Sequence, residues 1–217
     1  MPNPAVRAVL WDFGGVMTSS PFVAFARFER ERGLPQHFLR DINARDPHRN
    51  AWARFERSEL TPREFDEAFA AEARAAGHEV RGLDVIDLVY GEVRPEMVAA
   101  LKAAKPHFVN ACVTNNVDAG PARGFDRDRS RAVQWQQVLD LFDTVIESSK
   151  LGVRKPEPRF FELACAQLGI TPAQAVYLDD LGGNLKPARA MGMRTIKVED
   201  PAAAIAELES ALGIPLR

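Results

Sequence analysis

The chain has 217 residues, of which 46% are hydrophobic and 27% charged, so it can form one substantial globular domain with room for a modest insertion. Its 28 basic and 30 acidic residues give a formal net charge of −2, which excludes a function based on overall attraction to nucleic acid or to an anionic membrane. No signal segment begins the chain and no apolar stretch is long enough to span a membrane, so a cytoplasmic location is the default expectation.

An apolar run near the start of the chain ends abruptly on a carboxylate. Residues 6–11 are hydrophobic except for Arg7, and Asp12 follows them directly, with Gly14 and Gly15 behind it. Such a run predicts a strand that is buried on both faces, as in a parallel sheet. Asp12 would then lie at the carboxyl end of the strand, where open α/β sheets bind ligands. Taken alone, the stretch fits a strand-terminating turn without chemistry equally well.

The next segment, residues 19–91, follows helical patterns without a convincing strand. Ser20 and Pro21 predict an N-cap and first helical position, and Thr61 with Glu64 predicts a capping box. The predicted helices cover about 21–32, 35–43, 47–58 and 62–76. Their aromatic residues are expected to form a small core of their own: Phe22, Phe25, Phe38, Trp52, Phe55, Phe65 and Phe69. The segment is therefore predicted to be an all-helical insertion between the two parts of a core, residues 1–18 and 92–217.

From Pro95 onwards helices and strands alternate, which predicts an α/β fold with a parallel sheet. The predicted strands are 108–114, 144–147, 175–178 and 194–198, and the predicted helices 95–104, 158–168, 184–191 and 201–212. Residues 118–131, rich in Gly, Pro, Asp and Arg, are predicted to be a surface loop. Cys112 and Cys165 fall within a strand and a helix, so both are expected to be buried thiols.

Polar residues follow four predicted strands, at the edge where such a sheet performs chemistry. They are Asp12, Thr114 with Asn115, Lys155, and Asp179 with Asp180. Carboxylates can hold Mg²⁺ through hard oxygen ligands, and a lysine adds charge stabilisation. A further carboxylate can attack phosphorus, while a hydroxyl and backbone N–H groups hold the phosphate oxygens. The set therefore contains the chemical groups that phosphoryl transfer needs.

The same residues resemble the four motifs of the haloacid dehalogenase superfamily in order and spacing. They read Val9-Leu-Trp-Asp12-Phe-Gly-Gly-Val, Val113-Thr-Asn115, Lys155-Pro-Glu-Pro158 and Tyr177-Leu-Asp-Asp180. The runs 147–158 and 178–189 look especially like the subgroup that contains the phosphatase domain of soluble epoxide hydrolase and the domain fused to certain acyl-CoA dehydrogenases. The resemblance covers essentially the whole chain. It implies a Rossmann-like core, a helical cap inserted after the first motif, and Mg²⁺.

The resemblance also implies roles for individual residues. Asp12 is the implied nucleophile, Thr114 a catalytic phosphate ligand and Lys155 the organising cation. Asp180 is favoured as the direct metal ligand, supported by Asp179 and joined by Asp12 and the backbone carbonyl of Gly14. Gly15, Asn115 and Asn184 complete the expected substrate-binding set with Thr114. Asn184 also fits the start of a helix, and Arg154, beside Lys155, fits a surface position equally well.

One position departs from the pattern of the superfamily's phosphatases. They usually carry a second Asp two residues after the nucleophile, as general acid and base, and here that position is Gly14. Three outcomes are open: substrates with good leaving groups, a proton from another group or from water, or a weakly active or inactive relative. Similar sugar phosphatases with Gly at this position favour retained activity.

The predicted function is a Mg²⁺-dependent hydrolase of small phosphorylated molecules, acting through an aspartyl-phosphate. A metal-independent 2-haloacid dehalogenase is the main enzyme alternative, and Asp179 with Asp180 argues against it. The other alternative is a non-catalytic protein that binds phosphorylated metabolites. Within the cap, Trp52, Arg54 and Phe55 fit either a substrate-facing surface or the packed interior.

Overall fold

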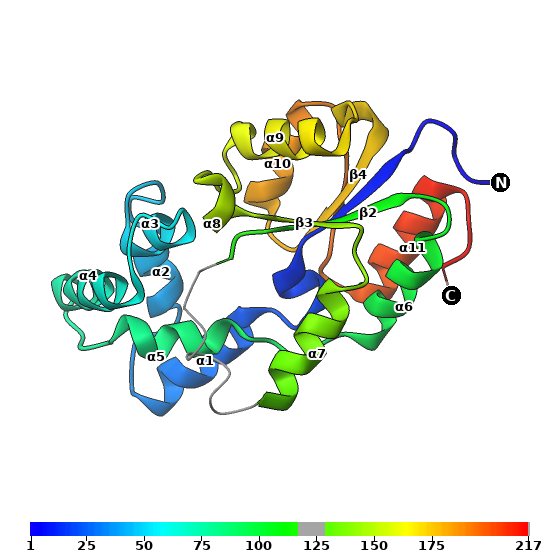
Figure 1. Ribbon diagram of the computed structural model, residues 1–217. Coiled ribbons are helices and arrows are strands. Elements are labelled where there is room, and N and C mark those ends of the chain that lie inside the picture. The colour runs from blue at the N-terminus through cyan, green and yellow to red at the C-terminus, as the bar shows by residue number, and fades with distance from the viewer. Residues whose placement is uncertain (117–128, 217) are drawn as a thin grey trace.

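The computed structural model describes residues 1–116 and 129–216 and confirms the α/β fold with a Rossmann-like parallel sheet (Figure 1). Five strands lie in the order β3-β2-β1-β4-β5, and every neighbouring pair is parallel. The strands are β1 (Ala8–Trp11), β2 (Val109–Thr114), β3 (Thr144–Glu147), β4 (Ala175–Asp179) and β5 (Arg194–Lys197). Because β1 is the central strand, the residues that follow it lie between the loops that follow β2 and β4.

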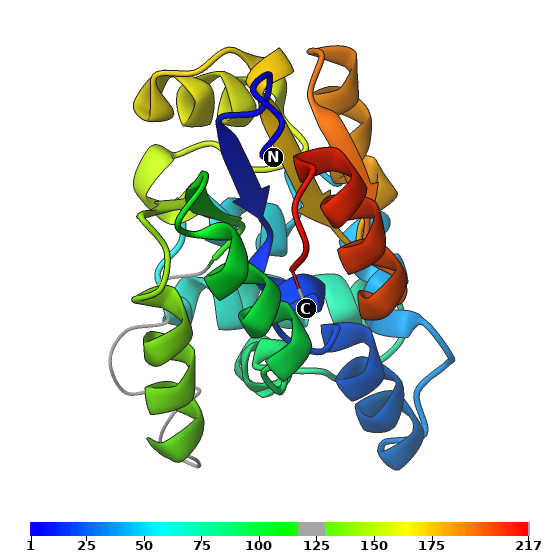
Figure 2. The same ribbon diagram turned by 90° about the vertical axis from the view of Figure 1, so that its right-hand side faces the viewer.

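Helices cover both faces of the sheet, as Figures 1 and 2 show. One buried cluster joins the sheet to α6 (Pro95–Ala104), α7 (Arg129–Leu139) and α11 (Pro201–Leu212). The cluster on the other face joins it to α9 (Pro158–Leu168) and α10 (Gly182–Ala190). Short helices α8 (Ser148–Leu151) and η3 (Pro172–Gln174) complete this part of the chain. Both cysteine thiols are buried and free, as expected.

Helix α7 corrects the loop prediction for residues 118–131. Residues 117–128 lie outside the described part of the chain, but 129–131 already belong to α7. Residues 133–139 contain no glycine or proline and are rich in good helix formers, which favours a helix. Val138 is buried while Val133 is exposed, so only part of the helix packs against the sheet. The loop prediction is therefore wrong for residues 129–131, and the rest of the predicted loop after Asn116 lies outside the described residues.

Residues 21–89 are helical, as predicted, and contain a separate buried cluster. The helices are α1 (Pro21–Glu31), α2 (Phe38–Ala44), α3 (Ala51–Glu56), α4 (Pro62–Ala75), α5 (Gly82–Ile86) and η2 (Asp87–Val89). Phe65 lies at the centre of their cluster, stacked on Phe55 with ring centroids 4.5 Å apart and touching Trp52 and Phe69 at 5.4 and 5.6 Å. The predicted capping box of Thr61 and Glu64 begins α4. The predicted aromatic core therefore exists, with Phe22 and Trp52 only partly buried at its edge.

The two ends of the helical segment lie side by side. Thr18 and Val93 form an antiparallel bridge, flanked by hydrogen bonds from Ser19 N to Glu92 O (2.7 Å) and from Arg94 N to Met17 O (2.8 Å). The chain thus leaves the sheet just after β1 and its irregular turn η1 (Phe13–Met17), and returns at the same place. None of the described helices is both long and apolar enough to cross a membrane.

Candidate active site

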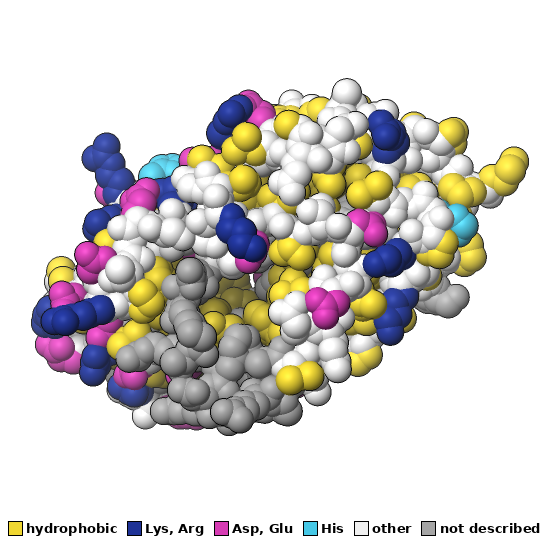
Figure 3. Space-filling model, in the orientation of Figure 1, with side chains coloured by type: hydrophobic (Ala, Val, Ile, Leu, Met, Phe, Trp, Pro, Cys, Tyr) yellow, Lys and Arg dark blue, Asp and Glu magenta, His cyan; other side chains and the backbone are white. Residues whose placement is uncertain are grey.

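A pocket of about 430 Å³ lies between the helical segment and the carboxyl ends of the strands. In Figure 3 the surface is hollowed there, and hydrophobic side chains are visible in the hollow. Parallel strands place the residues that follow them at one edge of the sheet, which brings the predicted polar residues together. Seven of the nine predicted site residues line the pocket: Asp12, Gly14, Thr114, Asn115, Lys155, Asp180 and Asn184. Gly15 and Asp179, the other two, are not among the lining residues.

Lys155 is the charged centre of the site and is 1% exposed. Its Nζ atom lies 2.8 Å from Asp12 Oδ1 and 2.9 Å from Asp179 Oδ2, and it donates to Val113 O at 2.9 Å. Burial alone would lower the pKa of Lys155, but the two carboxylates outweigh it and raise that pKa. Lys155 is therefore held as an ammonium ion between two acidic groups.

Asp179 is fully buried and fixes the position of this ammonium ion. Besides Lys155, its carboxylate accepts hydrogen bonds from the Tyr177 hydroxyl, from Leu181 N at 2.8 Å and from Asn184 Nδ2 at 3.0 Å. Burial alone would raise the pKa of Asp179, but Lys155 and the hydrogen bonds hold it below its usual value. Asn184 thus contacts Asp179 while also lining the pocket.

Asp12 directly follows the central strand and has one carboxylate oxygen engaged. Oδ1 accepts a hydrogen bond from Phe13 N at 2.7 Å and contacts Lys155. Within the described residues, Oδ2 has no hydrogen-bond partner. Burial, the largest influence, raises the pKa of Asp12 well above its usual value; Lys155 opposes this, and the charges of Asp179 and Asp180 add to it. The engaged oxygen fixes the orientation of the group, and the other is available to react.

Asp180 completes a cluster of three carboxylates. Oxygen atoms of Asp12, Asp179 and Asp180 all lie within 4.8 Å of one another. Burial and the charge of Asp179 raise the pKa of Asp180 to about 6, and Ser20 Oγ donates to Asp180 Oδ2 at 3.3 Å. The cluster thus holds three carboxylates, whose oxygen atoms are hard ligands, and one ammonium ion, which contacts two of them. This arrangement suits a divalent cation such as Mg²⁺.

The two glycines after Asp12 serve different purposes. Gly15 has φ of +76°, and a Cβ atom there would overlap the Asp180 carboxylate. Only glycine combines this backbone conformation with so close an approach. Gly14, by contrast, has φ of −68° and ψ of 131°, and a Cβ atom there would meet nothing within 4 Å. A side chain at position 14 is therefore compatible with both the backbone and the space.

The loop after β2 holds the backbone of Lys155. Asn115 Oδ1 accepts from Lys155 N at 2.8 Å, and its Nδ2 donates to Lys155 O at 2.9 Å. Asn115, predicted to bind substrate, therefore also positions the lysine. Thr114 is the last residue of β2, directly before Asn115, and it also lines the pocket. The sheet and this loop together fix Lys155 from both its ends.

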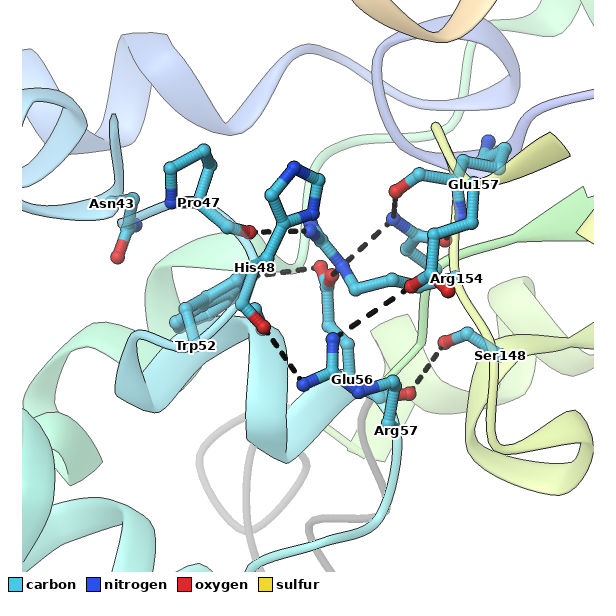
Figure 4. A network of polar contacts seen from close by, with 12 residues as sticks. Asn43, Pro47, His48, Trp52, Glu56, Arg57, Ser148, Arg154 and Glu157 are labelled. Atoms are coloured by element: carbon cyan, nitrogen blue, oxygen red, sulfur yellow. Dashed lines mark hydrogen bonds and ion pairs between the residues drawn. The ribbon is translucent and has the colours of Figure 1, made fainter. Parts of the chain in front are cut away.

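Some residues around the pocket were not predicted from the sequence. Figure 4 shows Glu56 of α3 beside Arg154, and both line the pocket. Ser20 occupies the N-cap position of α1 as predicted, but its side chain makes no capping hydrogen bond and donates to Asp180 instead. The structure also separates the three candidates on the cap. Trp52 lines the pocket, Phe55 is buried among the aromatics, and Arg54 lies on the surface near Glu59.

Comparison with known proteins identifies relatives of the chain. Residues 6–192 match the family of haloacid dehalogenase-like hydrolases. Acyl-CoA dehydrogenase family member 10 of Mus musculus is 33% identical over 97% of this chain and 19% of its own length. Bifunctional epoxide hydrolase 2 of Mus musculus is 31% identical over 96% of this chain and 39% of its own length. The chain thus spans less than half of either relative, and both belong to the subgroup expected from the sequence.

A solved structure shows the same fold. The enzyme bt-2542 of Bacteroides thetaiotaomicron, described as a member of the same family in complex with magnesium and inorganic phosphate, superposes with a TM-score of 0.58. It is 20% identical, and the match covers 90% of this chain and 96% of that one. Its magnesium and phosphate belong to that enzyme; the shared property is the arrangement of sheet and helices.

Proposed function

The chain belongs to the haloacid dehalogenase-like hydrolase family, and we propose that it hydrolyses small phosphate monoesters with Mg²⁺ and Asp12 as nucleophile. The observation that carries the proposal is the carboxylate cluster. Asp12, Asp179 and Asp180 lie within 4.8 Å of one another with Lys155 among them. A metal-independent dehalogenase gains nothing from gathering three carboxylates, whereas a phosphate dianion needs cations to offset its repulsion from Asp12.

The proposed reaction has two steps. In the first, Oδ2 of Asp12 attacks phosphorus, the bond from phosphorus to the ester oxygen breaks, and the leaving group departs with that electron pair. In the second, water attacks the aspartyl-phosphate, which releases inorganic phosphate and restores the Asp12 carboxylate. Lys155 binds Oδ1 throughout and so keeps Oδ2 directed at the substrate.

The other residues of the site hold the phosphate group. Thr114 and backbone N–H groups of the turn after Asp12 would bind its oxygen atoms. Asp12, Asp180 and the carbonyl of Gly14 would hold Mg²⁺, with Asp179 supporting them, and the ion would supply positive charge at the phosphate oxygens. Residues 19–91 would act as a cap over residues 1–18 and 92–217 and exclude bulk water from the pocket.

Gly14 limits which esters react quickly. General acid catalysis typically contributes about 10²–10⁴-fold, and Gly14 has no side chain to protonate the departing oxygen. Water can do so less efficiently. We therefore propose that the preferred substrates have leaving groups that are stable as anions, such as aryl or acyl phosphates.

A panel of substrates tests the proposal. We expect Mg²⁺-dependent phosphate release from 4-nitrophenyl phosphate and acetyl phosphate, lost with EDTA and restored by excess Mg²⁺. Colorimetric phosphate detection and chloride release from 2-chloropropionate would be measured in parallel. Turnover of the haloacid that is unaffected by EDTA would replace this proposal with a dehalogenase. Binding of phosphate without turnover of any ester would favour a non-catalytic protein.

Gly14→Asp should accelerate hydrolysis of esters with poor leaving groups. The backbone at position 14 accepts a side chain, and the space beside it is open to the pocket. We expect kcat for an alkyl phosphate such as glycerol 2-phosphate to rise by about tenfold or more, with little change for 4-nitrophenyl phosphate. Gly14→Asn is the matched control because it fills the same space without a titratable proton. An equal gain in both variants, or none in either, would show that protonation of the leaving group does not limit the rate.

A further inference from the structure

Glu56 is a nearly buried carboxylate in the wall of the pocket, contributed by the helical segment. It is 6% exposed, and its oxygen atoms accept hydrogen bonds from three side chains. Trp52 Nε1 donates to Oε1 at 2.8 Å, while Asn115 Nδ2 (3.3 Å) and Arg154 Nε donate to Oε2. Ser148 Oγ also donates to the backbone oxygen of Glu56 at 2.7 Å. Figure 4 shows Trp52, Ser148 and Arg154 directed toward Glu56 from both parts of the molecule.

Arg154 is tied to the helical segment by this contact. Its side chain is 15% exposed and forms an ion pair with Glu56, whose side chain is 8% exposed. The guanidinium group also donates from Nη1 to Pro47 O at 3.1 Å. A guanidinium group beside a phosphate site would normally be expected to bind anions in a bidentate manner. Here a carboxylate of the protein already occupies it.

Among the residues that the structure describes, the charges that line the pocket leave no unpaired cation for a second anionic group. Among the described lining residues the cations are Arg154 and Lys155. Lys155 lies between Asp12 and Asp179, and Arg154 is paired with Glu56. Much of the remaining lining is apolar or aromatic, and it includes Phe22, Phe25, Trp52, Tyr90 and Trp135. Such a wall solvates an uncharged group well and an anion poorly.

We propose that Glu56 is a specificity-determining residue that restricts the site to monoesters with an uncharged, largely apolar leaving group. It does so by pairing with Arg154, which makes this guanidinium group unavailable to an anionic leaving group. A leaving group that carries a carboxylate or a second phosphate would meet no unpaired cation among the described lining residues and would lie against a wall that solvates an anion poorly. The inference rests on the proposed function in taking the loops around Asp12 as the phosphate-binding end of the pocket.

The test compares two phosphonates that cannot be hydrolysed. Benzylphosphonate and 4-carboxybenzylphosphonate differ by one carboxylate at the end remote from phosphorus. Calorimetric titration with Mg²⁺ present gives both Kd values for each protein. The ratio compared is the Kd of 4-carboxybenzylphosphonate divided by the Kd of benzylphosphonate. We expect the wild type to bind benzylphosphonate at least about tenfold more tightly. Because no bond is broken, this measurement is independent of catalysis.

Substitutions at the ion pair should change this ratio in opposite directions. Glu56→Gln keeps the shape of the side chain and releases Arg154, so the ratio should fall to about one or below. Adding Arg154→Gln to that variant removes the released cation and should restore most of the preference. Arg154→Gln alone leaves Glu56 unpaired and should increase the preference. Thermal unfolding of each variant identifies any that fails to fold. The Kd ratios of the folded variants then test the role of Glu56.

Glu147→Gln is the matched control. Glu147 also lines the pocket, but it pairs with Lys150 and Asn116 and does not contact Arg154 in the described structure. Its substitution removes one negative charge without releasing Arg154, so the Kd ratio should stay near that of the wild type. The inference is overturned if Glu147→Gln and Glu56→Gln change the ratio equally, if Glu56→Gln leaves it unchanged, or if the wild type binds neither phosphonate. Selective binding without hydrolysis of 4-nitrophenyl phosphate would instead overturn the proposed function alone.

Discussion

Replacing Asp12 by Asn should lower Mg²⁺-dependent phosphate release by at least about 10⁴-fold, because loss of a nucleophile removes the covalent route altogether. The side chain keeps its shape, so Phe13 N can still donate to Oδ1 as it does in the wild type. The amide oxygen is a far weaker nucleophile than a carboxylate. The measurement is kcat for 4-nitrophenyl phosphate under saturating Mg²⁺.

Two further observations keep this result interpretable. The thermal unfolding midpoint should change little, and benzylphosphonate should still bind, since neither requires attack on phosphorus. In addition, rapid acid quenching of the wild type with labelled acetyl phosphate should trap a phosphoryl group on the protein that is missing from Asp12→Asn. Retention of more than a few per cent of kcat in the variant would assign the nucleophile to another residue or to water.

Lys155→Met should be the most destabilising substitution in the site. It leaves Asp12 and Asp179 buried without the ammonium ion that lies 2.8 and 2.9 Å from them. Breaking a buried ion pair by removing one partner typically costs about 3–5 kcal/mol. We expect a loss of this size in the free energy of unfolding, measured by urea denaturation with EDTA present so that no metal offsets it. Phosphate release should be lost as well.

Lys150→Met is the control for this prediction. Lys150 also pairs with a carboxylate, that of Glu147, but its side chain is 74% exposed. Exposed pairs contribute about 0–1 kcal/mol, so the substitution should have little effect on the free energy of unfolding. If both variants lose similar amounts, the position of Lys155 between two buried carboxylates has no special energetic role.

The fold could be predicted from the sequence where the signal is local. Residues 8–11 form β1, as a short continuous apolar run that stops at Asp12 predicts, and the strand is covered on both faces. Parallel strands then bring their carboxyl ends together, so topology places Thr114 and Asp179 at the same edge of the sheet as Asp12, whereas Lys155 also needs its contacts with Asn115. Helix α7 could not be placed in the same way, since among its described side chains Val138 alone is buried, and Trp135 and Leu139 are buried only in part.

The remaining parts of the site depend on contacts between distant residues. Glu56 and Arg154 are 98 residues apart in the sequence, and no local pattern around either residue predicts that the two form an ion pair. Beside Lys155, an arginine fits a solvated position as well as a pocket wall. Ser20 shows the same limit, because local rules predict the helix start that it marks but not its contact with Asp180. Local sequence patterns therefore indicate the reacting groups better than they indicate the surroundings that select a substrate.

The bridge between Thr18 and Val93 gives the helical segment the properties of an exchangeable cassette. An inserted unit whose two ends meet puts little constraint on the strands that flank it, and such units tolerate replacement and change of length. Much of the apolar pocket wall, together with Glu56, belongs to this cassette, whereas Asp12, Lys155 and Asp180 do not. Selectivity can therefore diverge by grafting one segment while the reaction stays fixed in the sheet.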